Sequence, residues 1–335
     1  MLNIFKKEVC EVITIGDTVI DAFIKLKEAH ITCKLDNTAC EICMKYGDKI
    51  PFESVEVING VGNSANAAVS MSRLGVKAGI YTNLGDDAYA TDCLNHFKSE
   101  KVLTTYITKN KDKKTNYHYV LWYGADRTIL IKHEVYDYLL PDISNIPWIY
   151  LSSLGENSLE FHGALGSFLK EHPDKKLVFQ PGTYQIRFGK DKLKDIYANT
   201  FLFFCNKEEA QTILDTKETN IALLMQKIAA LGPKHVILTD GPNGAYAWDG
   251  THSMFVPPYP DPKPPFERTG AGDAFASTVT TALILGKPLE EALLWAGINS
   301  TYVVQQLGAQ KGLLTQEEVK AFLEKAPANY KVKTL

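Results

Sequence analysis

A short run of small residues followed by a carboxylate is the feature of this chain best suited to chemistry. The stretch ERTGAGDAF places Asp273 directly after Gly270, Ala271 and Gly272. Apolar residues recur at helical spacing after it, so a helix is expected to begin here. Small residues and the free N–H groups of a first helical turn form an anion site, beside which a carboxylate could take the proton of an attacking hydroxyl. The alternative is that Asp273 is only a favourable first-turn charge.

Two further stretches have polar or glycine residues where a ligand could be held. Asn206 and Glu209 fall one helical turn apart after a strand-like run, so both can face one ligand. The stretch TDGPNG follows another such run and puts Thr239, Gly241 and Gly244 in a tight turn. Each stretch has a purely local alternative, because Asn206 suits a helix N-cap and the glycines suit any turn.

The N-terminal part of the chain contains two more candidates. The first strand-like run leads into GDTVID, which ends at Asp21, either a ligand-binding residue or a turn residue. The stretch NGVGNSANAA places Gly62 and Asn66 at the start of a predicted helix. Its G-x-G-x-x-A spacing, from Gly60, also matches a dinucleotide fingerprint, so an NAD-dependent dehydrogenase is the remote alternative. Against it, the motif follows a long insertion, and a Rossmann turn has no special need of Asn66.

Composition and charge exclude several classes of function. The chain has 335 residues, is 45% hydrophobic and 22% charged, and carries a net charge of -3. These values give no general footprint for nucleic-acid binding. The N-terminus lacks a signal-peptide pattern, and no window of about 18 apolar residues could span a membrane. We therefore expect a cytoplasmic protein with a small-molecule partner, without nucleic acid or membrane. HExxH, GxSxG and GxxxxGK[ST] motifs are absent from the sequence.

Six cysteines, at positions 10, 33, 40, 43, 93 and 205, do not suggest a disulfide scaffold in a chain of this length. They are expected to be reduced. The spacing Cys33-x6-Cys40-x2-Cys43 is the one pattern that could bind zinc. A closed zinc site needs four ligands, however, and His30 is isolated, so a structural turn is favoured.

Strand-like runs alternate with helical runs along most of the chain, which predicts an α/β fold with a mostly parallel central sheet flanked by helices. Ligands in such sheets bind at the carboxyl ends of the strands. Strand-like runs include 11–16, 55–59, 78–85, 148–155, 176–182, 200–206 and 235–241, and helical runs include 64–75, 208–214, 221–232 and 274–285. Two segments break the alternation, a long connection at 23–54 and a predicted hairpin at 115–135 around a Gly-Ala-Asp turn. Insertions of this kind are often lids or interfaces.

In their order along nearly the whole chain, these motifs resemble those of the ribokinase-like (PfkB) family of carbohydrate and nucleoside kinases. The most specific is TGAGDAF, in which the family's small residues form an anion hole and its acid is the catalytic base. The resemblance implies these roles for Gly270, Ala271 and Gly272, and for Asp273. It further implies that the substrate is held by Asp21, Gly62 and Asn66, the nucleotide by Asn206, Thr239, Gly241 and Gly244, and Mg²⁺ by Glu209.

Several positions depart from the family pattern. Gln180-Pro181-Gly182 stands where many members have Asp-Pro-Asn, and Val19 stands where ribokinases often have Asn. Val61 replaces the first glycine of the N-terminal signature, so the loop facing the sugar is expected to differ in shape. Glu267 occupies the place of an Asp that some members link to a monovalent cation such as K⁺. The late Gly308-Ala309 element matches the family.

The resemblance implies an ATP-dependent kinase of a small sugar, built as a single ribokinase-like domain over residues 1–335 with a small β lid. A ribonucleoside kinase is the alternative, because aromatic residues of the lid segments would suit a base or form lid core. A homodimer through the lid is also expected. The aromatic residues are Phe23, Tyr46, Phe52, Tyr117, Tyr119 and Trp122.

Overall fold

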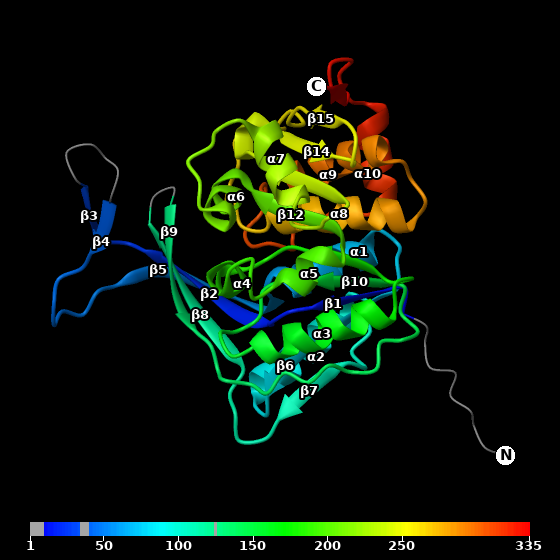
Figure 1. The fold of residues 1–335 in the computed structure, drawn as a ribbon. Coiled ribbons are helices and arrows are strands. Elements are labelled where there is room, and N and C mark those ends of the chain that lie inside the picture. Colours follow the sequence, from blue (N-terminus) through cyan, green and yellow to red (C-terminus); the bar gives the residue numbers. More distant parts are fainter. Residues whose placement is uncertain (1–9, 34–39, 124–125) are drawn as a thin grey trace.

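The computed structural model of the chain describes residues 10–33, 40–123 and 126–335. Within these ranges, one ten-stranded sheet runs through the body of the molecule (Figure 1). Its strands, from one edge to the other, are β16 (Lys333–Thr334), β15 (Ser253–Val256), β14 (Ala245–Trp248), β13 (His235–Thr239), β12 (Thr200–Asn206), β11 (Lys176–Phe179), β10 (Trp148–Leu151), β1 (Val12–Ile15), β6 (Ala78–Gly85) and β7 (Ile107–Asn110). The strands from β13 to β7 are parallel, and the other three form an antiparallel edge.

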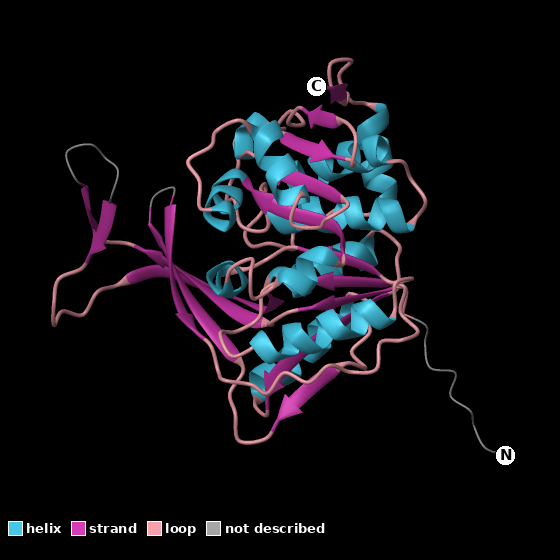
Figure 2. Ribbon diagram, in the orientation of Figure 1, coloured by secondary structure: helices cyan, strands magenta, loops and turns pink. Residues whose placement is uncertain are grey.

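Helices pack on both faces of this sheet (Figure 2), which confirms the predicted α/β fold. One face carries α1 (Asn63–Arg73), α8 (Ala271–Ile284), α9 (Leu289–Val303) and α10 (Gln316–Glu324). The other carries α3 (Leu159–Glu171), α5 (Lys194–Ala198), α6 (Lys207–Leu214) and α7 (Ile221–Ala229). The remaining helices are α2 (Ala88–Ser99), α4 (Thr183–Phe188) and the short 3-10 helix η1 (Gly241–Asn243). None of the helices in the described ranges is long and apolar enough to cross a membrane.

The core consists of two layers, one on each face of the sheet. Ile13, Ile149 and Phe203 point to the side of α3 and α7, and Val12 and Tyr150 point to the side of α8 and α9. Neighbouring residues of a strand face opposite ways, so a strand buried on both faces reads as a continuous apolar run. This is why the parallel strands could be found in the sequence.

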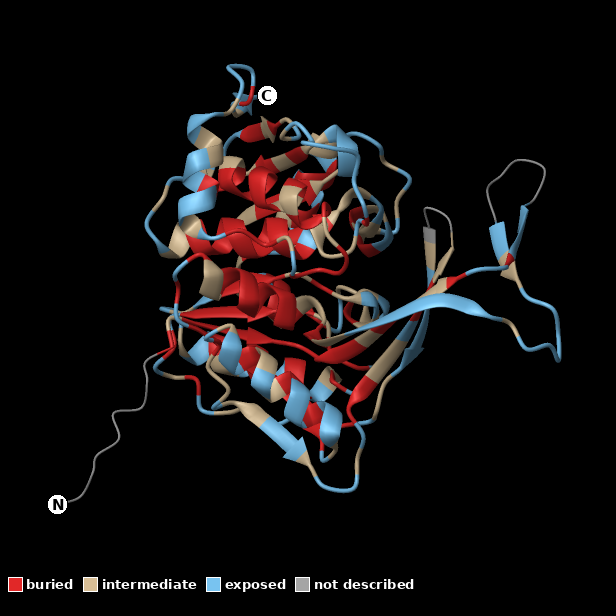
Figure 3. Ribbon diagram, turned by 180° about the vertical axis from the view of Figure 1, so that it is seen from behind, coloured by how far each residue is buried: buried red, intermediate tan, exposed pale blue. Residues whose placement is uncertain are grey.

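A second, four-stranded sheet projects from the body and is called the lid sheet here (Figures 1 and 3). Its strands are β5 (Phe52–Val61), β2 (Val19–Leu26), β8 (Asn116–Tyr123) and β9 (Asp126–Lys132), in that order. β8 and β9 pair antiparallel, as expected of a hairpin, while Gly124 and Ala125 of the expected turn lie outside the described residues. Phe23 and Val120 of the lid sheet pack against Leu307 of the body.

The run at 55–59 belongs to the lid sheet, which corrects one step of the sequence interpretation. β5 pairs antiparallel with β2 instead of opening a second unit of the parallel sheet. Its alternating pattern is typical of a strand with one solvated face. Asp21 and Gly62 therefore come from the lid sheet and from the turn after β5. The same geometry rules out the dinucleotide fingerprint, because Gly60 and Gly62 do not follow a parallel strand.

The expectation that all cysteines are reduced is wrong for two of them. Cys33 and Cys40 form a disulfide between β3 (His30–Cys33) and β4 (Cys40–Cys43), a separate two-stranded hairpin. The two residues are directly opposite in the antiparallel register, and their Cα atoms are 4.0 Å apart. Cys10, Cys43, Cys93 and Cys205 are free. In the part of the chain that the structure describes, no group of three or more His, Cys, Asp or Glu side chains could hold a metal ion.

Candidate active site

An open cavity of about 770 Å³ lies between the lid sheet and the body. Its walls come from β2 and β8 of the lid sheet and from the N-terminal ends of α1, α6 and α8. The structure thus brings together residues from motifs far apart in the sequence. The sequence-predicted site residues that line this cavity are Asp21, Gly62, Asn66, Asn206, Glu209, Thr239, Gly270, Ala271, Gly272 and Asp273.

A second cavity, of about 300 Å³, adjoins the first. The two share Thr239, Arg268, Ala271 and Gly272 in their walls. Much of the second cavity is apolar, and it is also lined by the predicted residues Gly241 and Gly244. Its apolar lining comes from Pro242, Ala245, Val256, Pro257, Pro258, Tyr259, Pro265, Phe275 and Val304. The residues predicted to bind nucleotide therefore divide between the two cavities.

The start of α8 presents free backbone donors to both cavities. Gly270 caps the helix with a left-handed φ of 80°, and a Cβ there would lie 2.4 Å from Cβ of Ala309. Only glycine suits this position, and the late Gly308-Ala309 element is what packs against it. The first hydrogen bond of the helix runs from Ala274 N to Gly270 O. The three preceding amides have no partner within the helix and can bind an anion.

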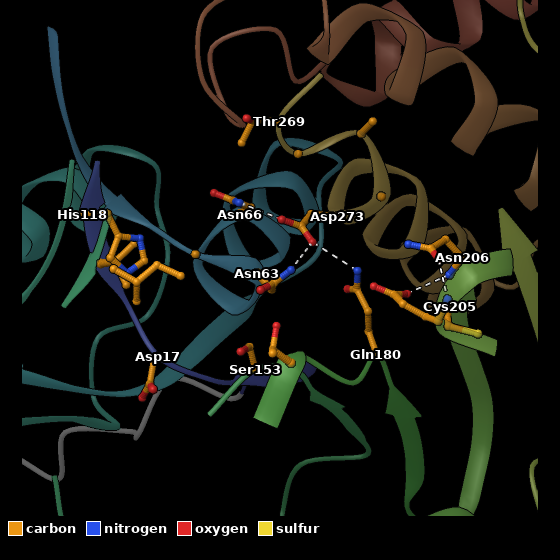
Figure 4. Close-up of a pocket in the computed structure, with 18 of the residues that line it drawn as sticks. Asp17, Asn63, Asn66, His118, Ser153, Gln180, Cys205, Asn206, Thr269 and Asp273 are labelled. Atoms are coloured by element: carbon orange, nitrogen blue, oxygen red, sulfur yellow. Dashed lines mark hydrogen bonds between the residues drawn. The ribbon is translucent and has the colours of Figure 1, made fainter. Parts of the chain in front are cut away.

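Asp273 lies at the centre of the first cavity, with a side chain held by three amide groups (Figure 4). Asn63 Nδ2 donates to Oδ1 at 2.8 Å, Asn66 Nδ2 donates to Oδ2 at 2.8 Å, and Gln180 Nε2 donates to Oδ1 at 3.1 Å. The residue is only 6% exposed. A carboxylate has about four acceptor positions, so three donors leave one free for a hydroxyl.

Gln180 was noted in the sequence only as a departure from the family pattern, and the structure gives it a contact. Tyr150, buried beneath it, donates its hydroxyl hydrogen to Gln180 Oε1. Burial raises the pKa of Tyr150 well above its ordinary value, and the charge of Asp273 adds to this. The hydroxyl therefore stays protonated, so Gln180 is held with its NH₂ group toward Asp273. The only sequence feature that could have indicated this contact is the place of Gln180 at the end of β11.

On the lid side of the cavity, two carboxylates are joined by a pair of histidines. Asp21 Oδ1 lies 3.3 Å from His118 Nδ1, and Asp17 Oδ2 lies 3.5 Å from His133 Nδ1. The two imidazoles meet at 3.0 Å through their Nε2 atoms. Tyr138 donates to Asp17 at 3.0 Å. Sequence reasoning found only Asp21, because Asp17 reads as a turn residue and the histidines read as hairpin positions.

Figure 4 shows how the cavity is divided. His118 and Asp17 lie on one side, Asn206 lies on the other, and Asp273 lies between them. The six aromatic residues of the lid segments are not among the described residues that line the cavity. Tyr46 and Phe52 are exposed, Phe23 is buried in lid core, Tyr117 and Tyr119 pack together, and Trp122 packs on Phe266.

Comparison with known proteins decides the family. The model of the pfkB family of carbohydrate kinases matches residues 16–316. The chain belongs to this family. It is 25% identical to the ribokinase of Bacillus subtilis, over 83% of this chain and 92% of that protein. It is also 25% identical to the nucleoside kinase of Methanocaldococcus jannaschii, over 79% and 85% of the two chains.

A solved structure agrees with this membership. The structure of Arabidopsis thaliana ribokinase complexed with ribose and ATP has a TM-score of 0.79 against this chain. The two are 17% identical, and the match covers 94% of this chain and 99% of that one. The fold is therefore ribokinase-like. As a member of the pfkB family, the chain is a phosphotransferase that acts on a hydroxyl group of a sugar or nucleoside.

The end of the cavity at α6 fits a divalent cation shared with a nucleotide. Asn206 and Glu209 form a capping box, in which Glu209 Oε2 accepts from Asn206 N and Asn206 Oδ1 accepts from Glu209 N, both at 2.8 Å. Burial raises the pKa of Glu209, the Asn206 hydrogen bond opposes this, and the charge of Asp273 adds to it. A bound cation would favour the charged form of the Glu209 carboxyl and so oppose the effect of burial. One carboxylate is sufficient, because Mg²⁺ is often held by one or two carboxylates and substrate phosphates.

Glu267, expected near a monovalent cation, contacts a cationic side chain. Arg127 of β9 forms an ion pair with Glu267 Oε1, which also accepts from Thr269 N at 2.7 Å. Glu267 Oε2 is buried and has no hydrogen-bond partner among the described residues. The guanidinium already balances the charge of Glu267, and K⁺ binding stays a prediction.

Replacement of Glu209 by Gln tests the metal role separately from the helix cap. Glutamine can also accept at this position of a capping box, so the melting temperature should stay close to that of wild type. The Mg²⁺ concentration for half-maximal activity should rise several-fold, because a charged ligand is lost. Titration of Mg²⁺ at saturating substrates measures it, with exposed Glu208→Gln as the control. An unchanged Mg²⁺ profile for Glu209→Gln would leave the pair as a helix cap only.

Proposed function

We propose that this pfkB kinase transfers the γ-phosphate of ATP to a hydroxyl of a small free sugar. The observation that carries the proposal is the position of Asp273. Its carboxylate has one acceptor position open and follows directly after the free amides of the α8 N-terminus. A base for the hydroxyl and a binding site for the phosphoryl group are thus adjacent, which is the arrangement that phosphoryl transfer needs.

In the proposed reaction, the sugar hydroxyl gives its proton to Asp273 while its oxygen bonds to the γ-phosphorus. The bond from that phosphorus to the oxygen bridging to the β-phosphate breaks, and this oxygen leaves with ADP. The amides of Ala271, Gly272 and Asp273 donate to the phosphoryl oxygens as negative charge moves across them. Bound Mg²⁺, which Asn206 and Glu209 would hold, supplies charge neutralisation at the β- and γ-phosphates.

We place the nucleotide across the two cavities. The second cavity is walled by apolar residues such as Val256, Tyr259 and Val304, which suits a purine ring. It shares Gly272 and Arg268 with the first cavity, so a nucleotide in it can extend its phosphates to the start of α8. This supports ATP as the phosphoryl donor.

The lid side of the first cavity favours a free sugar over a ribonucleoside. It carries the carboxylates of Asp17 and Asp21 and the imidazoles of His118 and His133, which suit hydroxyl groups. The lid aromatics that would suit a base do not line the cavity. A panel of pentoses, hexoses and ribonucleosides, read by ADP release, tests the proposal. Turnover with ribonucleosides alone would establish the alternative, and ADP release with neither class would overturn both.

Replacement of Asp273 by Asn should lower kcat by about 10²-fold or more, the scale expected for loss of a general base. The variant should keep its fold and its ATP affinity, since an amide has the same shape. Steady-state kinetics with the best sugar of the panel and ATP binding by calorimetry measure the two quantities. Turnover close to wild type would remove Asp273 from the proposed role.

Replacement of Asp21 by Ala should abolish discrimination among substrate hydroxyls. An acceptor left without its donors costs roughly 1–3 kcal/mol, so a substrate lacking the relevant hydroxyls should lose about 10- to 150-fold in kcat/KM with the wild type. Comparison of deoxy and hydroxylated substrates gives this ratio for each protein. Glu53→Ala, an exposed lid carboxylate paired with Lys25, is the control. An unchanged ratio in Asp21→Ala would mean that Asp21 reads no hydroxyl.

We further propose that two copies pair through the lid sheet. Val57, Tyr119 and Leu130 form one row across β5, β8 and β9, with Ala22 of β2 between the first two. All three are exposed apolar side chains. An apolar row of this kind on a projecting sheet is typical of an interaction site.

Replacement of Val57 by Asp should therefore shift the protein from dimer to monomer, because a charge in an apolar interface is not compensated. Val57 is 47% exposed, so the fold should be retained. Sedimentation velocity over a range of concentrations measures the shift, with Leu223→Asp on α7 as a matched control. A wild-type protein that sediments as a monomer throughout would contradict the pairing.

A further inference from the structure

Behind the proposed base lies Gln310, a buried polar side chain that is not among the described residues lining either cavity. Gln310 follows the Gly308-Ala309 element, is 4% exposed, and contacts Asn66 and His96. We propose that Gln310 is a positioning residue for Asp273, acting through the amide of Asn66. The inference rests on the proposed function, in which Asp273 is the base.

The direction of the Gln310 amide is set by a backbone carbonyl. Gln310 Nε2 donates to Gly60 O at 2.8 Å, and a carbonyl oxygen can only accept. The NH₂ group must therefore lie on this side. The opposite end agrees, because Gln310 Oε1 lies 2.6 Å from His96 Nε2, which serves as the donor when this nitrogen carries the proton.

The orientation of the Gln310 amide in turn fixes the orientation of the Asn66 amide. The same Gln310 Nε2 donates to Asn66 Oδ1 at 2.9 Å, which occupies the oxygen of the Asn66 amide. The NH₂ group of Asn66 is left to face Asp273 Oδ2, at 2.8 Å. An Asn66 amide turned by 180° would place its oxygen against the carboxylate and its NH₂ group against the NH₂ group of Gln310. Gln310 therefore disfavours the one orientation that would repel the base.

Gln180 is oriented in a similar way by Tyr150, a contact made on the other side of Asp273. The amides of Asn66 and Gln180, each held by a second residue, thus both donate to the carboxylate of Asp273. Asn66 lines the cavity, and Gln310 is not among the lining residues, so Gln310 has no contact of its own with a ligand there. In the proposal, its effect on turnover comes through the orientation of Asn66.

The test is the replacement of Gln310 by Met, which is similar in length and neither donates nor accepts strongly. With Asn66 Oδ1 no longer held by a donor, kcat should fall by about 10- to 100-fold, the scale of a small misplacement at a reacting group. The KM values for ATP and for the sugar should stay within about twofold. Gln310→Glu keeps the shape and cannot donate to Gly60 or Asn66, so its kcat should fall at least as far. It provides the same test if the Met variant does not fold.

A matched control and a double-mutant cycle separate positioning from general damage. Gln305→Met, in the same stretch, removes a buried donor to Lys263 O at 3.1 Å that has no link to Asn66, and its kcat should stay near wild type. In an Asn66→Ala background, Gln310→Met should change kcat by less than about twofold, because the group it acts on is gone. A full additional loss in that background, an unchanged kcat in Gln310→Met, or an equal loss in Gln305→Met would each overturn the inference. Wild-type turnover of Asp273→Asn would instead overturn the proposed function.

Discussion

The structure of the site depends on holding one buried carboxylate, that of Asp273, in a fixed orientation within the cavity. A buried carboxylate is costly unless hydrogen bonds replace its water shell. Asp273 obtains three of them, from the two asparagines at the start of α1 and from Gln180 after β11. These contacts tie α1, the parallel sheet and α8 into one arrangement. The helix start that carries the carboxylate also carries the free amides, so the same contacts place the anion site.

The lid sheet completes this arrangement from the other side. It brings the carboxylate of Asp21 and the imidazole of His118 to the cavity, and the turn from the first strand brings Asp17. Of these, His118 and Asp17 lie across Asp273 from Asn206 (Figure 4). One carboxylate therefore lies between a region rich in hydroxyl-binding groups and a region that suits a cation. Arg127 links the lid sheet to the segment before α8 through Glu267, so the position of the lid and the start of the helix are physically coupled.

Sequence patterns were sufficient for the parts of the fold that are buried on both faces. The apolar runs of β10, β12 and β13 and the helix after Gly270 follow from period and composition alone. The partner of β5 could not be predicted, since an alternating pattern specifies one solvated face and not a neighbour. The disulfide was missed because spacing does not give register, and register is what sets Cys33 against Cys40. Asp273 and Asn66 could be found from motifs, whereas Gln310 matters through a contact 244 residues away in the chain.

The sequence distance between the groups around Asp273 has a consequence for how the protein is made. The asparagines that hold this side chain are 207 and 210 residues earlier, and the residue that packs on Gly270 comes near the C-terminal end, at Ala309. Contacts over such distances form late, because the loops between them must be closed first. During synthesis the first half of the sheet can fold while Asp273 and the helix start that carries it are still absent. A nascent chain that has not yet reached Ala309 therefore lacks the contact that packs against Gly270, and with it the complete form of the proposed site.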